Sequence, residues 1–516
     1  MSAACLVESP PAVRLTVSPG VAAAGLIAAS FALNLVYLAA YCPHDLAPDE
    51  AHYWDWSRQL DWAYYSKGPL VAWLIRASCT AFGDTPFGVR FPAAVCSALL
   101  LSAVYRLTAD HLSPRSGLLA VGVGLTLPLV ATGATLMTID APLLACWAWA
   151  AVAVSRGHWA AAGVLCGVGV LAKPTMLLFP ACVGLWLFVS GRRPQLMGRR
   201  FLTLVGFAGG GLLPLLVWNA THGWTGLAHL LALGGIGAAG PAVRPFGPLE
   251  YVGTQAAVLL GFWLVAWVAA VCRPDRGTGL LWWLSVPVWL LFAASSLLAK
   301  PQANWPAVAY VTGLPLAVGW AVAGGPWVGR GLVAAVVLGA GVNLVVRFPV
   351  LVRPTLAAVA VTDRPAPLRS LDPTTRLAGW RTLAEAVDRL RAEARAETGD
   401  EPLVAGMSWT LPGELAFYCA GRPTVYSFGP AVGERHSQYD VWRPNPTADA
   451  QAFRGRAFVY VGELNPAILG AFDRMGPPVE VVASDGGVPV NRWVARAGYG
   501  FRGFPADINI EKGRRF

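Results

Sequence analysis

Long apolar segments alternate with short polar ones through the first 350 residues of the chain. A run of about 20 apolar residues can cross the hydrocarbon core of a bilayer as a helix. The runs are continuous, whereas the strands of a membrane barrel alternate. We therefore predict a polytopic α-helical membrane protein with about eleven transmembrane helices. They are expected near residues 20–41, 87–107, 116–134, 138–155, 158–172, 174–190, 201–219, 251–272, 279–298, 304–323 and 329–350.

The pattern changes near residue 351 to charged, proline-containing sequence. Apolar residues from Leu377 to Leu390 recur at helical spacing and predict one helix. Short apolar runs predict strands. They lie near residues 402–407, 423–427, 457–461 and 479–482. The chain thus divides into a transmembrane domain, residues 1–350, and a mixed α/β soluble domain, residues 351–516.

Composition supports a membrane protein. Only 13% of the residues are charged and the mean hydropathy is +0.52, whereas soluble domains carry about 25% charged residues. The net charge of +10 comes from arginines in short loops between apolar runs, as on the inner side of a membrane, and does not indicate nucleic-acid binding. The nine cysteines lack metal-ligand spacing and read as apolar packing residues.

The arginine distribution also predicts orientation. With the N-terminus inside, the arginine-rich loops all face the cytoplasm, and an odd number of helices puts the C-terminal domain outside the inner (plasma) membrane. Two long loops share the outer side, residues 42–86 and about 220–250. In the first, an interfacial helix is expected near residues 51–60, and its aromatic residues suit the headgroup region.

The outer side also collects scarce charges. Of only four lysines in the chain, Lys67, Lys173 and Lys300 are predicted to face this side. Most carboxylates of the membrane half, among them Asp49, Glu50 and Asp140, do so as well. A membrane protein that gathers its charges on one face is predicted to have a polar site there.

The carboxylates have alternative interpretations. Asp49 could act as a general base for an acceptor hydroxyl, or the pair Asp49-Glu50 could simply begin the interfacial helix, where the helix dipole favours carboxylates. Asp140 at membrane depth is a candidate functional residue, and helix capping is its alternative. Because His52 lies near Glu50 in the sequence, a divalent metal site remains an open alternative.

The lysines also have alternatives. In the string Lys67-Gly68-Pro69, a tight turn could point the ammonium at a lipid phosphate, or the lysine could snorkel to the interface. Lys173 could serve the same site or only end a helix, and Lys300 could do so or only anchor one.

Five short motifs then resemble, in order and spacing, the GT-C fold, family 39 type glycosyltransferases. This group includes protein O-mannosyltransferases and aminoarabinose lipid A transferases. The motifs span about residues 20–190. They are Asp49-Glu50-Ala51-His52-Tyr53, Lys67-Gly68-Pro69-Leu70, Phe82-Gly83 with Val89-Arg90-Phe91-Pro92, Thr138-Ile139-Asp140-Ala141-Pro142 and Leu171-Ala172-Lys173-Pro174. One departure is Gly68, where the family usually has proline, and we expect it to loosen the placement of Lys67.

The resemblance implies an enzyme that moves a sugar from a polyprenyl-phosphate carrier to a hydroxyl of a lipid, glycan or protein, with inversion, on the non-cytoplasmic face. In that function Asp49 is the base, and Glu50 and Asp140 orient the acceptor. Lys67, helped by Arg58, Lys173 or Lys300, holds the phosphate. Tyr64 and Tyr65 cover the sugar or the lipid. No cofactor is implied with certainty.

The rival prediction is a transporter or flippase for a lipid-linked or anionic substrate. Transporters place key polar residues near the midplane, on broken helices of repeated halves. Here the charges lie at one surface, and the sequence shows no inverted repeat. A scaffold that only presents the C-terminal domain would leave the acidic first loop unexplained.

Overall fold

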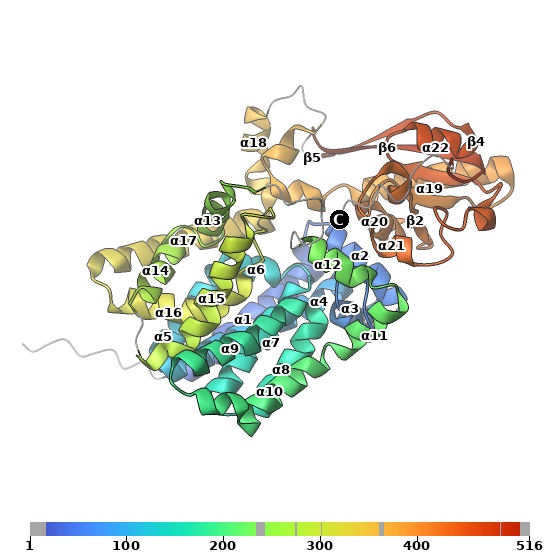
Figure 1. Ribbon diagram of the computed structural model, residues 1–516. Helices are drawn as coiled ribbons and strands as arrows, with labels where there is room; N and C mark the ends of the chain where they lie inside the picture. The colour runs from blue at the N-terminus through green and yellow to red at the C-terminus, as the bar shows by residue number, and fades with distance from the viewer. Residues whose placement is uncertain are drawn as a thin grey trace, which may run out of the picture.

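The computed structural model describes residues 17–233, 243–273, 276–300, 302–360, 366–485 and 487–505. Part of the predicted second outer loop, 234–242, lies outside the described residues. The molecule consists of a body of helices and a C-terminal region built on a sheet. The C-terminal region lies against the end of the helical body that carries α2 and α12 (Figure 1).

Several helices of the body begin at a hydroxyl cap followed by proline. In α1, α4 and α5 the caps are Ser18, Thr85 and Ser113, whose side chains accept backbone N–H groups of the first turn. Such caps satisfy N–H groups that lack a partner within the helix, and proline fits the first helical position. The helices are α1 (Pro19–Val36), α2 (Pro48–Arg58), α3 (Leu70–Phe82), α4 (Pro86–His111), α5 (Pro114–Thr126), α6 (Pro128–Gly133), α7 (Asp140–Ser155), α8 (Trp159–Ala172), α9 (Leu178–Val189), α10 (Arg199–Gly210), α11 (Leu213–Thr221), α12 (Thr225–Leu233), α13 (Gly247–Val258), α14 (Phe262–Val271), α15 (Gly279–Ser295), α16 (Ala307–Ala323), α17 (Pro326–Arg347) and α18 (Arg353–Val359).

The predicted helical membrane body is confirmed, but the number of crossings is not fixed. Among the described residues, 4 helices are long and apolar enough to span a membrane. They are Pro19–Tyr41, Pro86–His111, Arg199–Thr221 and Pro326–Arg347. The predicted helix 251–272 is instead a pair, α13 and α14, bent by 112°, which would make a fifth span. The remaining apolar helices have 10–17 residues, so the count of eleven stays a prediction.

The first outer loop folds differently from the prediction of an interfacial helix. Its helix α2 is buried along nearly its whole length, and Trp54 and Trp56 are 0% exposed. An apolar helix, α3, follows within the same loop. The aromatic residues of α2 therefore do not face the headgroup region, because they are buried in a core shared with the C-terminal region. Trp62, which follows α2 in the same loop, is 59% exposed.

The C-terminal region contains the predicted mixed α/β structure. All four predicted strands are present, and two more, β4 and β6, were not predicted. The strands are β1 (Leu403–Gly406), β2 (Val425–Ser427), β3 (Phe458–Val461), β4 (Phe472–Met475), β5 (Val479–Asp485) and β6 (Val488–Phe501), with helices α19 (Trp380–Thr398), α20 (Thr410–Tyr418), α21 (Gln438–Val441) and α22 (Pro466–Gly470). The order of the strands in the sheet is β2-β1-β3-β6-β4, with β5 also paired to β6. Strand β1 runs parallel to β2 and β3, and the partners of β6 are antiparallel to it.

The first outer loop and the C-terminal region share one hydrophobic core. Helix α20 crosses α2 so closely that a Cβ on Gly413 would lie 2.7 Å from the backbone of Ala51 and His52. The ring centroids of Trp54 and Phe417 lie 4.8 Å apart. The division at residue 350 stays a prediction, because residues on both sides of it build this core.

Candidate active site

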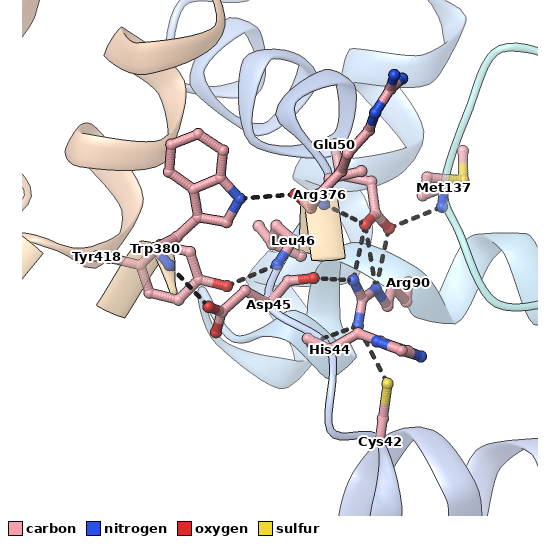
Figure 2. A network of polar contacts seen from close by, with 11 residues as sticks. Cys42, His44, Asp45, Leu46, Glu50, Arg90, Met137, Arg376, Trp380 and Tyr418 are labelled. Carbon is pink, nitrogen blue, oxygen red and sulfur yellow. Dashed lines mark hydrogen bonds and ion pairs between the residues drawn. The ribbon is translucent and has the colours of Figure 1, made fainter. Parts of the chain in front are cut away.

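The carboxylate of Glu50 accepts hydrogen bonds from several protein groups at once (Figure 2). Arg90 of α4 donates to its carboxylate with Nη2 at 2.8 Å, and the backbone N–H groups of Ala47 and Met137 donate at 2.9 Å each. Arg90 also donates to the carbonyls of His44 and Asp45. Both side chains are essentially inaccessible, at 1% for Arg90 and 0% for Glu50.

This network gives Glu50 a structural role. Its oxygens are engaged by Arg90 and by two backbone N–H groups, and Glu50 lines none of the cavities described below. The predicted role in orienting an acceptor is therefore replaced by another: Glu50 fixes the start of α2 against α4 and the segment before α7. The partner of Glu50, Arg90, lies in the Val89-Arg90-Phe91-Pro92 motif, but the motif alone does not show that the arginine binds Glu50.

Asp49, one residue earlier, points into a polar cavity of about 280 Å³. The polar cavity is lined by Asp49, His52, Tyr53, Tyr65, Ser66, Lys67, His229, Gln302, Trp305, Trp409, Arg435, His436 and Ser437. The hydroxyl of Tyr53 donates to Asp49 at 3.3 Å. The Asp49 side chain keeps accessible surface where it lines the cavity, and the surrounding protein raises its pKa by burial, against the opposing effect of Lys67.

Lys67 lines the same polar cavity, from a tight turn. The backbone N–H of Tyr64 donates to the carbonyl of Lys67 at 3.0 Å, and that of Lys67 donates back at 3.3 Å. Burial, and then the charge of Lys173, lower the pKa of Lys67. Asp49 and Lys67, which the sequence predicted to share one site, thus both line the polar cavity.

The departure at Gly68 has the opposite effect from the expected loosening. A Cβ at this position would lie 2.1 Å from the carbonyl oxygen of Leu171, at the end of α8. Only glycine lets two backbones approach this closely. Gly68 therefore allows the Lys67 turn to pack directly against the end of α8, just before Lys173.

Asp140 connects three segments instead of capping its own helix. Its Oδ1 accepts a hydrogen bond from Lys173 Nζ at 2.9 Å, and its Oδ2 accepts one from Asn304 Nδ2 at 2.6 Å. The pair of Asp140 and Lys173 is only partly buried. It does not line the polar cavity, but its charges influence the pKa values of Asp49 and Lys67, so both residues lie next to the site.

Of the other predicted residues, Tyr65 lines the polar cavity, whereas Arg58, Tyr64 and Lys300 do not. Arg58 pairs with Asp55 at 3.1 Å and donates to the carbonyl of Arg422, so it holds the C-terminal region and not a phosphate. Tyr64 stacks on Trp56, with ring centroids 4.3 Å apart. Lys300 is exposed and is absent from the cavity lining, which its neighbours Gln302 and Trp305 join instead.

A second, apolar cavity of about 220 Å³ adjoins the first. The two share only Tyr65, Ser66 and Lys67. The rest of the apolar cavity is lined by Ala63, Tyr64, Pro174, Leu177, Leu212, Leu215, Leu216, Asn219, Trp224, Gly226, Leu227 and Leu230. The lysine thus stands where a polar space meets an apolar one.

A third cavity, of about 530 Å³, lies between the helical body and the C-terminal region. This interdomain cavity shares Asp49 and Trp409 with the polar cavity, and Arg369 and Arg376 line it as well. The carboxylate of Asp49 is therefore accessible from two sides.

Sequence reasoning missed the residues that the C-terminal region brings to the polar cavity, chiefly Trp409 and Arg435. Nothing in their local sequence marks them, because their place depends on the docking of α20 onto α2. The metal option at His52 finds no support: within the described residues, no group of three or more His, Cys, Asp and Glu side chains is placed to hold a metal ion.

Comparison with known proteins places this geometry in context. Residues 66–218 match the model of the dolichyl-phosphate-mannose-protein mannosyltransferase family. A lipid A galacturonosyltransferase of Rhizobium johnstonii is 30% identical over 312 residues, which cover 57% of this chain and 64% of that protein. An undecaprenyl phosphate-α-4-amino-4-deoxy-L-arabinose arabinosyl transferase of Sodalis glossinidius is 29% identical over 188 residues, 32% of this chain and 33% of that one. The chain thus spans less than two thirds of the length of these relatives.

The fold also matches a solved structure. The apo crystal structure of ArnT from Cupriavidus metallidurans aligns with a TM-score of 0.61 at 15% identity, over 92% of this chain and 98% of that one. The same protein bound to undecaprenyl phosphate aligns with a TM-score of 0.60 at 16% identity, over 92% and 97%. The predicted resemblance to GT-C glycosyltransferases is confirmed.

Proposed function

We propose that this protein is an integral membrane glycosyltransferase that moves a sugar from a polyprenyl-phosphate carrier to a hydroxyl acceptor, with inversion, on the non-cytoplasmic face. One observation carries the proposal: Lys67 stands at the boundary between the polar cavity, which holds Asp49, and the apolar cavity. A lipid-linked sugar has the same division, with a polar sugar and an apolar chain on either side of a phosphate.

The two cavities suit the two halves of such a donor. The isoprenoid chain would enter the apolar cavity, whose leucines come from α11 and α12 and from the segment around Leu177. The phosphate would meet the ammonium of Lys67, a compact charge suited to phosphate. Lys173, in its ion pair with Asp140, is a second ammonium group close enough to affect the pKa of Lys67.

Asp49 is then the general base. It accepts the proton of the acceptor hydroxyl as that oxygen bonds to the anomeric carbon of the sugar. The bond from the anomeric carbon to the phosphate oxygen breaks, and the polyprenyl phosphate leaves with the bonding electron pair. No general acid is required, because a phosphate is already a good leaving group. Lys67 stabilises the charge that develops on it.

The interdomain cavity offers a path for the acceptor. It includes Asp49 and shares no lining residue with the apolar cavity, so we infer that a hydroxyl there approaches the sugar opposite the departing phosphate, as inversion requires. Arg369 and Arg376 favour an acceptor with anionic groups. The lipid A galacturonosyltransferase among the relatives supports a lipid acceptor. We place the reaction, and the C-terminal region, on the extracytoplasmic side of the inner membrane.

The test is reconstitution of the full chain in nanodiscs with radiolabelled polyprenyl-phosphate sugar and a lipid A preparation. The proposal predicts a labelled lipid product and release of polyprenyl phosphate. Vesicles that contain the protein should be assayed in parallel for movement of the lipid-linked sugar between leaflets. Movement without any transfer product would replace the glycosyltransferase by the rival transporter or flippase.

A further inference from the structure

Arg435 is a cation that the C-terminal region brings to the polar cavity. It follows the short 3-10 helix Gly429–Val432, and its guanidinium carbon lies 4.6 Å from the ring centroid of Trp409. Trp409 precedes α20, the helix that docks on α2. Arg435 and Trp409 thus line the cavity together with Asp49 and Lys67.

Arg435 has no ion-pair partner within the described residues. Among the described residues, no carboxylate forms an ion pair with it, and its Nε is buried without a hydrogen-bond partner. Other arginines of the same region are paired: Arg422 binds Asp84 at 2.9 Å and Arg381 binds Asp45 at 3.0 Å. A charged donor that faces a cavity without a partner is costly unless a ligand supplies the acceptor.

Arg435 lies within electrostatic range of the two central residues of the site. Burial raises the pKa of Asp49, and Arg435 is among the charges that oppose this shift. Burial, Lys173 and Arg435 lower the pKa of Lys67. A guanidinium that acts on both groups is close to the space between them.

Two of the three imidazoles in the cavity, those of His52 and His229, do not add to the positive charge. Burial lowers the pKa of His52 to about 3 and that of His229 to about 4, so both are neutral near pH 7. The third imidazole, His436, lies 4.0 Å from the carboxylate of Asp440. Besides these rings, the polar cavity holds the cations Lys67 and Arg435 and the carboxylate Asp49. A phosphodiester, with a single negative charge, would restore the balance.

We propose, on the basis of the function proposed above, that Arg435 binds an anionic oxygen group of the lipid-linked donor. Lys67 borders the apolar cavity and Arg435 does not, so the arginine contacts the donor on the side of its sugar. The group is either the phosphate or an acid group on the sugar. The C-terminal region thereby supplies part of the donor site.

The experiment compares Arg435→Gln, Arg435→Lys and the wild-type protein in nanodiscs. Undecaprenyl phosphate is the binding probe, and transfer is measured with a neutral and a uronic-acid donor. Arg381→Gln is the matched control, since it removes a paired arginine of the same interface. Loss of a charged hydrogen bond should weaken donor binding about tenfold, as a higher KM with a smaller change in kcat. Arg435→Lys should recover part of the loss, and Arg381→Gln should leave the KM for the donor unchanged.

The outcomes separate the two sources and the two proposals. Weaker binding of undecaprenyl phosphate by Arg435→Gln assigns the arginine to the phosphate. Unchanged binding of this probe, with a loss confined to the uronic-acid donor, assigns it to the sugar. If neither changes while the wild type binds and transfers, this inference is wrong and the proposed function stands. If the wild type neither binds undecaprenyl phosphate nor transfers sugar, both are wrong.

Discussion

Two neighbouring carboxylates at the start of α2 occupy opposite kinds of environment. Glu50 is enclosed by Arg90 and by backbone N–H groups (Figure 2). Asp49 opens onto two cavities, one of which also holds Lys67 and Arg435, two cations without an ion-pair partner in the described part of the chain. Successive residues of a helix point about 100° apart, because the helix has about 3.6 residues per turn. One acidic pair can therefore serve the fold and the chemistry at the same time.

The contrast separates structural charge from functional charge. A buried ion pair whose hydrogen bonds are all made holds segments in place, and removing one partner leaves an uncompensated charge. A carboxylate that faces a cavity opposite unpaired cations has no such role within the fold. Burial raises the pKa of Asp49, a shift that is common for groups at catalytic sites.

The largest effect on turnover is expected for Asp49→Asn. The amide cannot accept the proton of the acceptor hydroxyl, so kcat should fall by about 10²- to 10⁴-fold, the usual contribution of a general base. The melting temperature should stay close to that of the wild type, because the hydrogen bond from Tyr53 is the only one the structure assigns to this carboxylate within the described residues. The measurement is transfer of labelled sugar alongside thermal unfolding in nanodiscs.

The pH profile of the wild type provides the control for this prediction. The base must be ionised, and burial raises the pKa of Asp49 above its ordinary value. The rate should therefore fall, as the pH is lowered, at a higher pH than an exposed aspartate would give. A variant Asp49→Asn that retains wild-type turnover would remove this residue as the base.

Arg90→Met should show the reverse pattern, a loss of stability before any loss of chemistry. Glu50 would keep its charge in a buried place without its cation, at a cost of about 3–5 kcal/mol. We expect a much lower melting temperature and poor recovery of folded protein. The double variant Glu50→Gln with Arg90→Met should recover part of the loss, because it removes both charges. If Arg90→Met folds as well as the wild type, the network is not structural.

The sequence analysis placed Asp49 and Glu50 in the same site and did not predict this contrast. The motif around Asp49 and the turn at Lys67 were local signals, and the helical body brings both residues to one cavity as expected. Glu50 could not be distinguished from Asp49, because their difference depends on Arg90, 40 positions away. The same limit hid Arg435, which the fold of the C-terminal region brings to the cavity beside Trp409.

The helix boundaries show a related limit. The apolar runs gave the positions of the helices, but a run does not reveal a bend such as that between α13 and α14, where Leu260 and Gly261 have positive φ angles. The aromatic residues of the first outer loop suited a membrane interface, and the same residues suit a core. Only the covering C-terminal region decides between these environments.

Gly68→Ala tests how strictly Lys67 must be placed. The new Cβ would lie 2.1 Å from the carbonyl oxygen of Leu171, so the turn must move away from α8. We expect an increase of about tenfold in the KM for the donor, since a shift of about 1 Å in a binding group is enough for such a loss. Undecaprenyl phosphate binding should weaken in parallel. Unchanged binding would mean that the position of the Lys67 turn is set elsewhere.

The smallest effect is expected for Lys300→Gln, which separates position in the sequence from position in the site. Lys300 and Lys67 open similar strings, but Lys300 is exposed and outside the polar cavity. Exposed substitutions of this kind change free energies by less than about 0.5 kcal/mol, so the KM for the donor should stay within about twofold. Lys67→Gln is the comparison, with loss of the cation at the boundary of the two cavities. A tenfold loss in Lys300→Gln would mean that the segment before α16 moves toward the phosphate when the donor binds, and that the lysine belongs to the site.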